Sequence, residues 1–164
     1  MLEISPSAKI SKLSDIEDSV RGTRIVIKSG VVIDSFVKIK AVGGTGDLFI
    51  GENSYINSGT VIYTGNGIQI GSGVLIAANC TLAPVNHEYA SKDKTILSQR
   101  FMPSKGGILV EDDVWIGANS VICDGAIIRQ GAVIGANSVV LGGEELESYG
   151  VYVGNPLRLI KRRQ

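Results

Sequence analysis

The chain has 164 residues, enough for one domain with a buried core. Lysine plus arginine equals aspartate plus glutamate at 16 each, so no basic surplus predicts binding to nucleic acid or to an anionic membrane surface. The N-terminus has no apolar stretch like that of a signal peptide, no run is long enough to span a membrane, and two cysteines are too few for a secreted disulfide scaffold. We therefore expect a cytoplasmic location.

Large aliphatic residues recur at intervals of six along most of the chain, and eighteen of them share this register. A period of six fits neither an α-helix nor long alternating strands. It fits short strands, each followed by a turn, with one large side chain pointing inward. In chain order the residues are Ile4, Ile10, Ile16, Ile27, Ile33, Ile39, Ile50, Ile56, Ile62, Ile70, Ile76, Leu82, Val110, Ile116, Ile122, Ile128, Ile134 and Val140.

This pattern predicts an all-β solenoid in which three hexads form one triangular coil. Coils spaced about 4.8 Å apart would bury a column of isoleucine and valine, and six of them would span about 29 Å. A composition of 21 glycines and only 5% aromatic residues agrees, because such a core is filled by stacked aliphatic side chains. A β-sandwich is disfavoured, since it gives no reason for eighteen residues in one register.

The register breaks in four places. Five extra residues follow Ile16, five more follow Ile39, and two are inserted near Thr64–Gly67, all of which predict small corner loops. The largest break, residues 83–109, is too long for a corner and holds the only histidine, His87. Long loops on rigid scaffolds often carry function.

The chain is predicted to form a single domain over residues 1–164. After the last hexad, Leu157–Arg163 is expected to form a short C-terminal helix within a cap at residues 155–164.

Three segments carry a resemblance to a known family. They are Gly51–Asn57, Leu75–Leu82 leading to His87, and Asp112–Asn119, with weaker support from Ile134–Ser138 and Gly154–Pro156. With its hexads, the chain resembles the hexapeptide-repeat acyltransferase superfamily, and within it the sugar O-acetyltransferases, including galactoside, maltose and polysaccharide-modifying enzymes. The resemblance implies a left-handed parallel β-helix of about six coils and a homotrimer with active sites between subunits.

The resemblance also implies a reaction, in which an acetyl group passes from acetyl-CoA to a hydroxyl of a sugar or surface polysaccharide such as O-antigen or capsule. His87 matches the general base of the family. Histidine suits this role because its ordinary pKa, about 6.5, lies near neutral pH. A backbone carbonyl or Glu88 could orient the ring. No metal is implied.

Further site residues follow from matching positions. Asn57 and Trp115 are expected to contact the acceptor, with Tyr89 and Gln99 of the long loop as further candidates. Each also has a simpler structural interpretation. Asn57 could be a turn residue, Trp115 could cover the contact between subunits, and Tyr89 and Gln99 could be solvated loop residues. Residues expected to contact acetyl-CoA are Gly117, Ala118, Ala136, Asn137 and Lys161, although small corner residues are also required by the fold.

Other functions remain open. The same fold supports N-acetyltransferases that act on amino-sugar nucleotides, and also non-catalytic scaffolds. A ping-pong mechanism through Cys80 or Cys123 is disfavoured, because both lie within hexads and are expected to pack in the core. A carbonic anhydrase on this fold is excluded, since its zinc needs three histidines and the chain has one.

Overall fold

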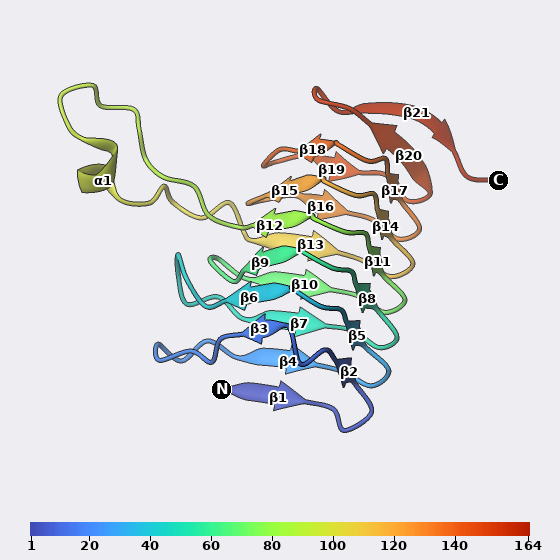
Figure 1. Cartoon of the computed structure of the whole chain (residues 1–164). Coiled ribbons are helices and arrows are strands. Elements are labelled where there is room, and N and C mark those ends of the chain that lie inside the picture. The colour runs from blue at the N-terminus through green and yellow to red at the C-terminus, as the bar shows by residue number, and fades with distance from the viewer.

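The computed structural model describes residues 1–164 and shows three parallel sheets that the chain visits in turn (Figure 1). Sheet A consists of β1 (Leu2–Ile4), β4 (Ile25–Ile27), β7 (Leu48–Ile50), β10 (Ile68–Ile70), β13 (Ile108–Val110), β16 (Ile127–Ile128) and β19 (Glu145–Leu146). Sheet B consists of β2 (Lys9–Ile10), β5 (Val32–Ile33), β8 (Tyr55–Ile56), β11 (Leu75–Ile76), β14 (Trp115–Ile116), β17 (Val133–Ile134), β20 (Gly150–Val153) and β21 (Arg158–Arg162). Sheet C consists of β3 (Asp15–Ile16), β6 (Lys38–Lys40), β9 (Val61–Tyr63), β12 (Thr81–Ala83), β15 (Val121–Cys123) and β18 (Val139–Val140). The solenoid predicted from the six-residue period is confirmed.

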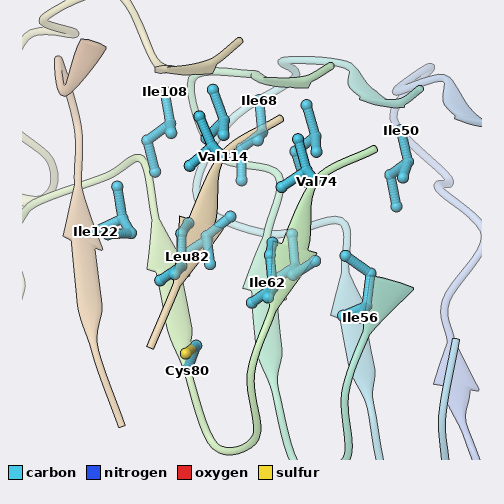
Figure 2. Close-up of a cluster of buried hydrophobic side chains, with 14 of the residues drawn as sticks. Ile50, Ile56, Ile62, Ile68, Val74, Cys80, Leu82, Ile108, Val114 and Ile122 are labelled. Carbon is cyan, nitrogen blue, oxygen red and sulfur yellow. The ribbon is translucent and has the colours of Figure 1, made fainter. Parts of the chain in front are cut away.

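The core consists of the predicted residues stacked in register. In sheet B, for example, Ile56 pairs with Ile76, which pairs with Ile116 and then Ile134. All four are almost fully buried, and their counterparts in sheets A and C point into the same interior (Figure 2). Most strands supply one large inward side chain and β4, β7, β10 and β13 supply two, so neighbouring coils close one another's core.

Small residues between the large ones complete the interior. Eight residues that each lie four positions after a large one are all buried: Ser54, Thr60, Val74, Cys80, Ser120, Ala126, Ala132 and Ser138. Their hydroxyls bond to backbone groups of the next coil, as when Ser54 Oγ donates to Gly71 O at 2.8 Å and accepts from Val74 N at 3.0 Å. Buried polar groups at these corners are therefore satisfied, which avoids a desolvation cost.

The two ends of the prism differ. At the N-terminal end, Ile4 is 40% exposed and Ile10 is only half-buried, because no further coil covers them. At the C-terminal end the chain reverses after β20, and β21 pairs antiparallel with β20.

The prediction of a C-terminal helix was therefore wrong. β20 has a free edge, and β21 satisfies its backbone groups by pairing with it. Leu157, which directly precedes β21, packs against the core cluster, whereas all five residues of β21 are exposed.

Every insertion into the six-residue register lies at the same corner of the prism, where sheet C leads to sheet A. The connections are residues 17–24, 41–47, 64–67 and 84–107. They stack on one another, since a Cβ on Gly43 would touch Val85, and Asn66 N donates to Pro84 O at 3.0 Å. The long loop, which projects from the prism with α1 (Ile96–Gln99), therefore rests on shorter loops beneath it (Figure 1).

The observed loop runs from residue 84 to 107, so the predicted 83–109 includes one residue of β12 and two of β13. The structure contains no helix long and apolar enough to cross a membrane.

Candidate functional site

The long loop has two arms that pair where it leaves the prism. His87 and Phe101 form an antiparallel bridge, and Met102 N donates to Asn86 O at 2.9 Å. Glu88 N donates to Arg100 O at 3.0 Å on the other side of the bridge. These contacts fix the backbone of His87 although the surrounding loop is exposed.

The His87 ring is oriented by a backbone carbonyl. Its Nδ1 lies 3.1 Å from Arg100 O, and its ring centroid lies 4.7 Å from that of Phe101. A carbonyl oxygen can only accept, so Nδ1 carries the hydrogen and Nε2 of the neutral ring has a free lone pair. Of the two orienting groups left open by the sequence, the structure shows the carbonyl. The Glu88 carboxylate instead accepts from Tyr89 N and Ala90 N, at 2.8 and 2.9 Å.

Arg100 places this carbonyl by adopting an unusual backbone conformation. Its φ and ψ are 63° and −133°, a region of backbone conformation that residues other than glycine seldom adopt. The same oxygen accepts from Glu88 N and from His87 Nδ1. The local strain is thus offset by two hydrogen bonds.

His87 lines a pocket of about 580 Å³ between the loop and the end of sheet C. Tyr89 of the loop shares this pocket and is 69% exposed, and its contact with an acceptor stays a prediction. The complete lining is Asn86, His87, Tyr89, Ile96, Met102, Lys105, Cys123, Leu141 and Gly142. Apolar side chains beside a few polar ones are typical of small-molecule sites.

The far end of the loop is held by Asp124, which directly follows β15 and is 2% exposed. Its carboxylate accepts from Lys105 N at 2.8 Å, Gly107 N at 2.9 Å and Asn66 Nδ2 at 3.0 Å. The buried charge is therefore paired with three donors. Neither Asp124 nor Lys105 was predicted from the sequence; the only signal was an acidic residue two positions after the hexad anchor Ile122.

Gln99 holds the loop together from within. Its side-chain amide accepts from Ser91 N at 2.9 Å and donates to Ser91 O and Lys94 O at 3.0 and 3.2 Å. These bonds give it a structural role, and contact with an acceptor stays a prediction.

The remaining predicted residues lie elsewhere on the prism. Asn57, Gly117, Ala118, Ala136 and Asn137 stack at the corner where sheet B leads to sheet C. The Asn57 amide donates to Ile76 O at 2.8 Å, and a Cβ on Gly117 would lie 2.5 Å from Ala136 N, so both residues also serve the fold.

Trp115 and Lys161 belong to sheet B. Trp115 is half-exposed on its outer face, in register with exposed Tyr55 and Leu75 on neighbouring strands. Lys161 is exposed on β21 and pairs with Val151.

One chain therefore does not bring all the predicted residues together. The His87 pocket lies at one end of sheet C, and the stack that contains Asn57 and Gly117 lies at the other end. Trp115 is on a different sheet again.

Both thiols are held in the neutral form. Cys80 is fully buried and donates to Gly117 O at 3.2 Å, and burial raises the pKa of its thiol. Cys123 is half-buried in the His87 pocket, and burial likewise raises its pKa, with a smaller contribution from Glu144. Neither is activated as a nucleophile. The structure also contains no group of three or more His, Cys, Asp or Glu residues arranged to hold a metal ion.

Two family models match the chain. The bacterial transferase hexapeptide model matches residues 107–142, and the model of the hexapeptide repeat of succinyl-transferase matches residues 48–84. A probable macrolide acetyltransferase from Lysinibacillus sphaericus is 36% identical over 62 residues, which are 38% of this chain and 33% of that protein. The chain thus spans about a third of this curated relative.

Solved structures match over far more of the chain. A variant of AntD, an N-acyltransferase from Bacillus cereus in complex with dTDP-4-amino-4,6-dideoxyglucose and coenzyme A, has a TM-score of 0.81 and 27% identity over 99% of this chain and 84% of its own. A hexapeptide-repeat acetyltransferase from Vibrio cholerae O1 biovar eltor, complexed with acetyl coenzyme A, has a TM-score of 0.61 and 25% identity over 86% and 69%. A maltose O-acetyltransferase from Clostridium difficile 630 shares the fold, with a TM-score of 0.58 and 20% identity over 99% and 70%.

The stacked hexads and the similar structures define a left-handed parallel β-helix of the hexapeptide-repeat type. The resemblance to the hexapeptide-repeat acyltransferases, inferred from the motifs, is confirmed.

Proposed function

We propose that this protein is an acetyltransferase that moves an acetyl group from acetyl-CoA to a sugar, with His87 as general base. The observation that carries the proposal is the hydrogen bond from His87 Nδ1 to Arg100 O, because it leaves Nε2 able to accept a proton beside a pocket. The similar proteins include acetyltransferases and CoA-bound acyltransferases, which supports the reaction class.

The chemistry needs one base and no metal. His87 Nε2 takes the proton of the acceptor hydroxyl while the oxygen attacks the thioester carbonyl carbon. The tetrahedral intermediate then collapses, the carbon–sulfur bond breaks, and the imidazolium returns its proton to the departing CoA thiolate. His87 begins and ends the cycle neutral, so no second titrating side chain is required.

A second copy of the chain would complete the site. In one chain, His87 and the Asn57 and Gly117 corner flank opposite ends of sheet C, and Trp115 lies on the outer face of sheet B. In the homotrimer we propose, the projecting loop of one subunit approaches these residues of its neighbour. Asn57 and Trp115 then contact the acceptor, while Gly117, Ala118, Ala136, Asn137 and Lys161 line the path of the pantetheine arm.

O-acetylation of a surface polysaccharide, such as O-antigen or capsule, or of its precursor in the cytoplasm is the acceptor reaction we favour. N-acetylation of an amino-sugar nucleotide is the second candidate, and it is supported by the similarity to AntD over 99% of the chain. An amine that reacts unprotonated needs less help from a base than a hydroxyl does. Loss of the imidazole should therefore slow O-transfer more than N-transfer.

A thiol-release assay with acetyl-CoA tests the proposal. Wild-type protein is offered neutral oligosaccharides, nucleotide-linked sugars and amino-sugar nucleotides, and free CoA is measured against a reaction without acceptor. Release that depends on a hydroxyl sugar supports O-transfer, and release only with amino sugars supports the second candidate. Calorimetry that detects no binding of acetyl-CoA would leave a non-catalytic scaffold as the remaining interpretation.

A further inference from the structure

We propose that Lys105 forms an anion-binding subsite beside His87, which binds a phosphate or carboxylate group carried by the acceptor. This inference rests on the proposed acetyl transfer and assigns a charge to the acceptor of that reaction. It is carried by the position of Lys105, by the lining of the His87 pocket, and by the length of the acetyl donor.

The fold fixes where the Lys105 side chain lies. Its backbone N–H is bound by the buried carboxylate of Asp124 at 2.8 Å. Its stem then lies against two glycines, since a Cβ on Gly125 would be 2.6 Å from Lys105 Cβ, and one on Gly142 would be 3.1 Å from Cδ and 3.3 Å from Nζ. The ammonium group is thus directed along the end of sheet C into the pocket that contains His87.

The ammonium of Lys105 forms no ion pair within the chain. None of the residues that line the pocket is acidic. Two carboxylates border the pocket outside this lining and are held by backbone N–H groups: Asp124 accepts from Lys105 and Gly107, and Glu144 accepts from Leu141 at 2.7 Å. Among the residues that line the pocket, Lys105 is therefore the one lysine or arginine, and its ammonium is available to an anionic ligand.

The same position argues for the acceptor rather than the donor as the source of the anion. If His87 acts on the thioester, the thiol end of acetyl-CoA must lie at this pocket. The phosphates of CoA are at the opposite end of the extended pantetheine arm, away from Lys105. A cation within the pocket of the base is placed to meet an anionic group on the acceptor.

The experiment compares three full-length proteins: wild type, Lys105→Met, and Lys92→Met. Lys92 is an exposed lysine of the same loop, lies outside the pocket and forms no ion pair, so its variant is the matched control. Calorimetry measures the affinity of each protein for dTDP, as a phosphate probe, for glucuronate, as a carboxylate probe, and for acetyl-CoA. Lys105→Arg tests whether a cation alone restores binding.

We expect Lys105→Met to weaken binding of dTDP or glucuronate about tenfold, the weight of one charge-assisted hydrogen bond. Lys92→Met and Lys105→Arg should stay within about twofold of wild type, and the affinity for acetyl-CoA should be unchanged. Equal affinities in Lys105→Met and wild type, or binding of neither probe by wild type, would overturn the subsite. So would a loss of affinity confined to acetyl-CoA, which would assign the cation to the donor. Failure of wild type to bind acetyl-CoA would instead refute the proposed function, so the two failures are distinguishable.

Discussion

The uninterrupted coils and the long loop are built on different principles. From β13 to β18 each hexad adds one strand and at least one buried aliphatic residue, stacked in register on the coil before it. In residues 84–107, by contrast, no hydrophobic residue of the loop enters the core cluster, and the shape is held by hydrogen bonds, both between the backbones of its two arms and between side chains and backbone. Stability is concentrated in the coils, and the candidate chemistry lies in a loop that the coils only anchor.

The largest expected difference is in stability. Ile76 is fully buried in β11, whereas Ile96 is 58% exposed in the loop. Ile76→Ala should lower the free energy of unfolding by about 2–5 kcal/mol, because it removes apolar area and leaves a cavity. Ile96→Ala should change it by about 0.5 kcal/mol or less. Urea unfolding of both variants checks the comparison, and equal losses would show that the loop shares the core.

The anchor of the loop provides the next test. Asp124→Ala leaves the Lys105 N–H, the Gly107 N–H and the Asn66 amide without their acceptor, which should cost about 1–3 kcal/mol. Trypsin should also cleave the loop faster.

The control for this test is Glu147→Ala. It removes an exposed ion pair with Arg162, which solvent screens, so stability and loop cleavage should both stay close to wild type. A slower or unchanged rate of loop cleavage in Asp124→Ala would show that Asp124 does not hold the loop.

A smaller effect is expected at Arg100, and it concerns turnover rather than the stability of the coils. Arg100→Pro restricts φ to negative values, so the carbonyl that orients His87 must move. Turnover should fall about tenfold, corresponding to the loss of one hydrogen bond. Arg100→Gly adopts the observed conformation without strain and should keep near-normal turnover. Equal turnover in the two variants would refute the role of this carbonyl.

The smallest effect is expected from the thiols. Cys123→Ser and Cys80→Ala should leave turnover within about twofold of wild type, because burial raises the pKa of both thiols and keeps them protonated. Steady-state kinetics of each variant checks this. A covalent acetyl-cysteine in the wild type, detected by mass spectrometry, would restore the ping-pong mechanism.

The same contrast explains what could be predicted from the sequence. The positions of Ile56, Ile76 and Ile116 follow from spacing alone, because each coil repeats the geometry of the last. The β21 strand was not predicted. Whether Leu157–Arg163 forms a helix or a strand depends on the free edge of β20, which the spacing of residues does not describe. Likewise the motif singled out His87, but its partner Arg100 lies thirteen residues away and acts through backbone geometry that no residue type encodes.

Turnover of His87→Ala tests the central claim most directly. The variant is compared with wild type in the thiol-release assay with a hydroxyl acceptor, alongside its thermal unfolding and its elution volume. We predict a fall in kcat of about 10²–10⁴-fold with unchanged unfolding and assembly, the usual contribution of a general base. Turnover within about twofold of wild type would contradict the assignment of His87.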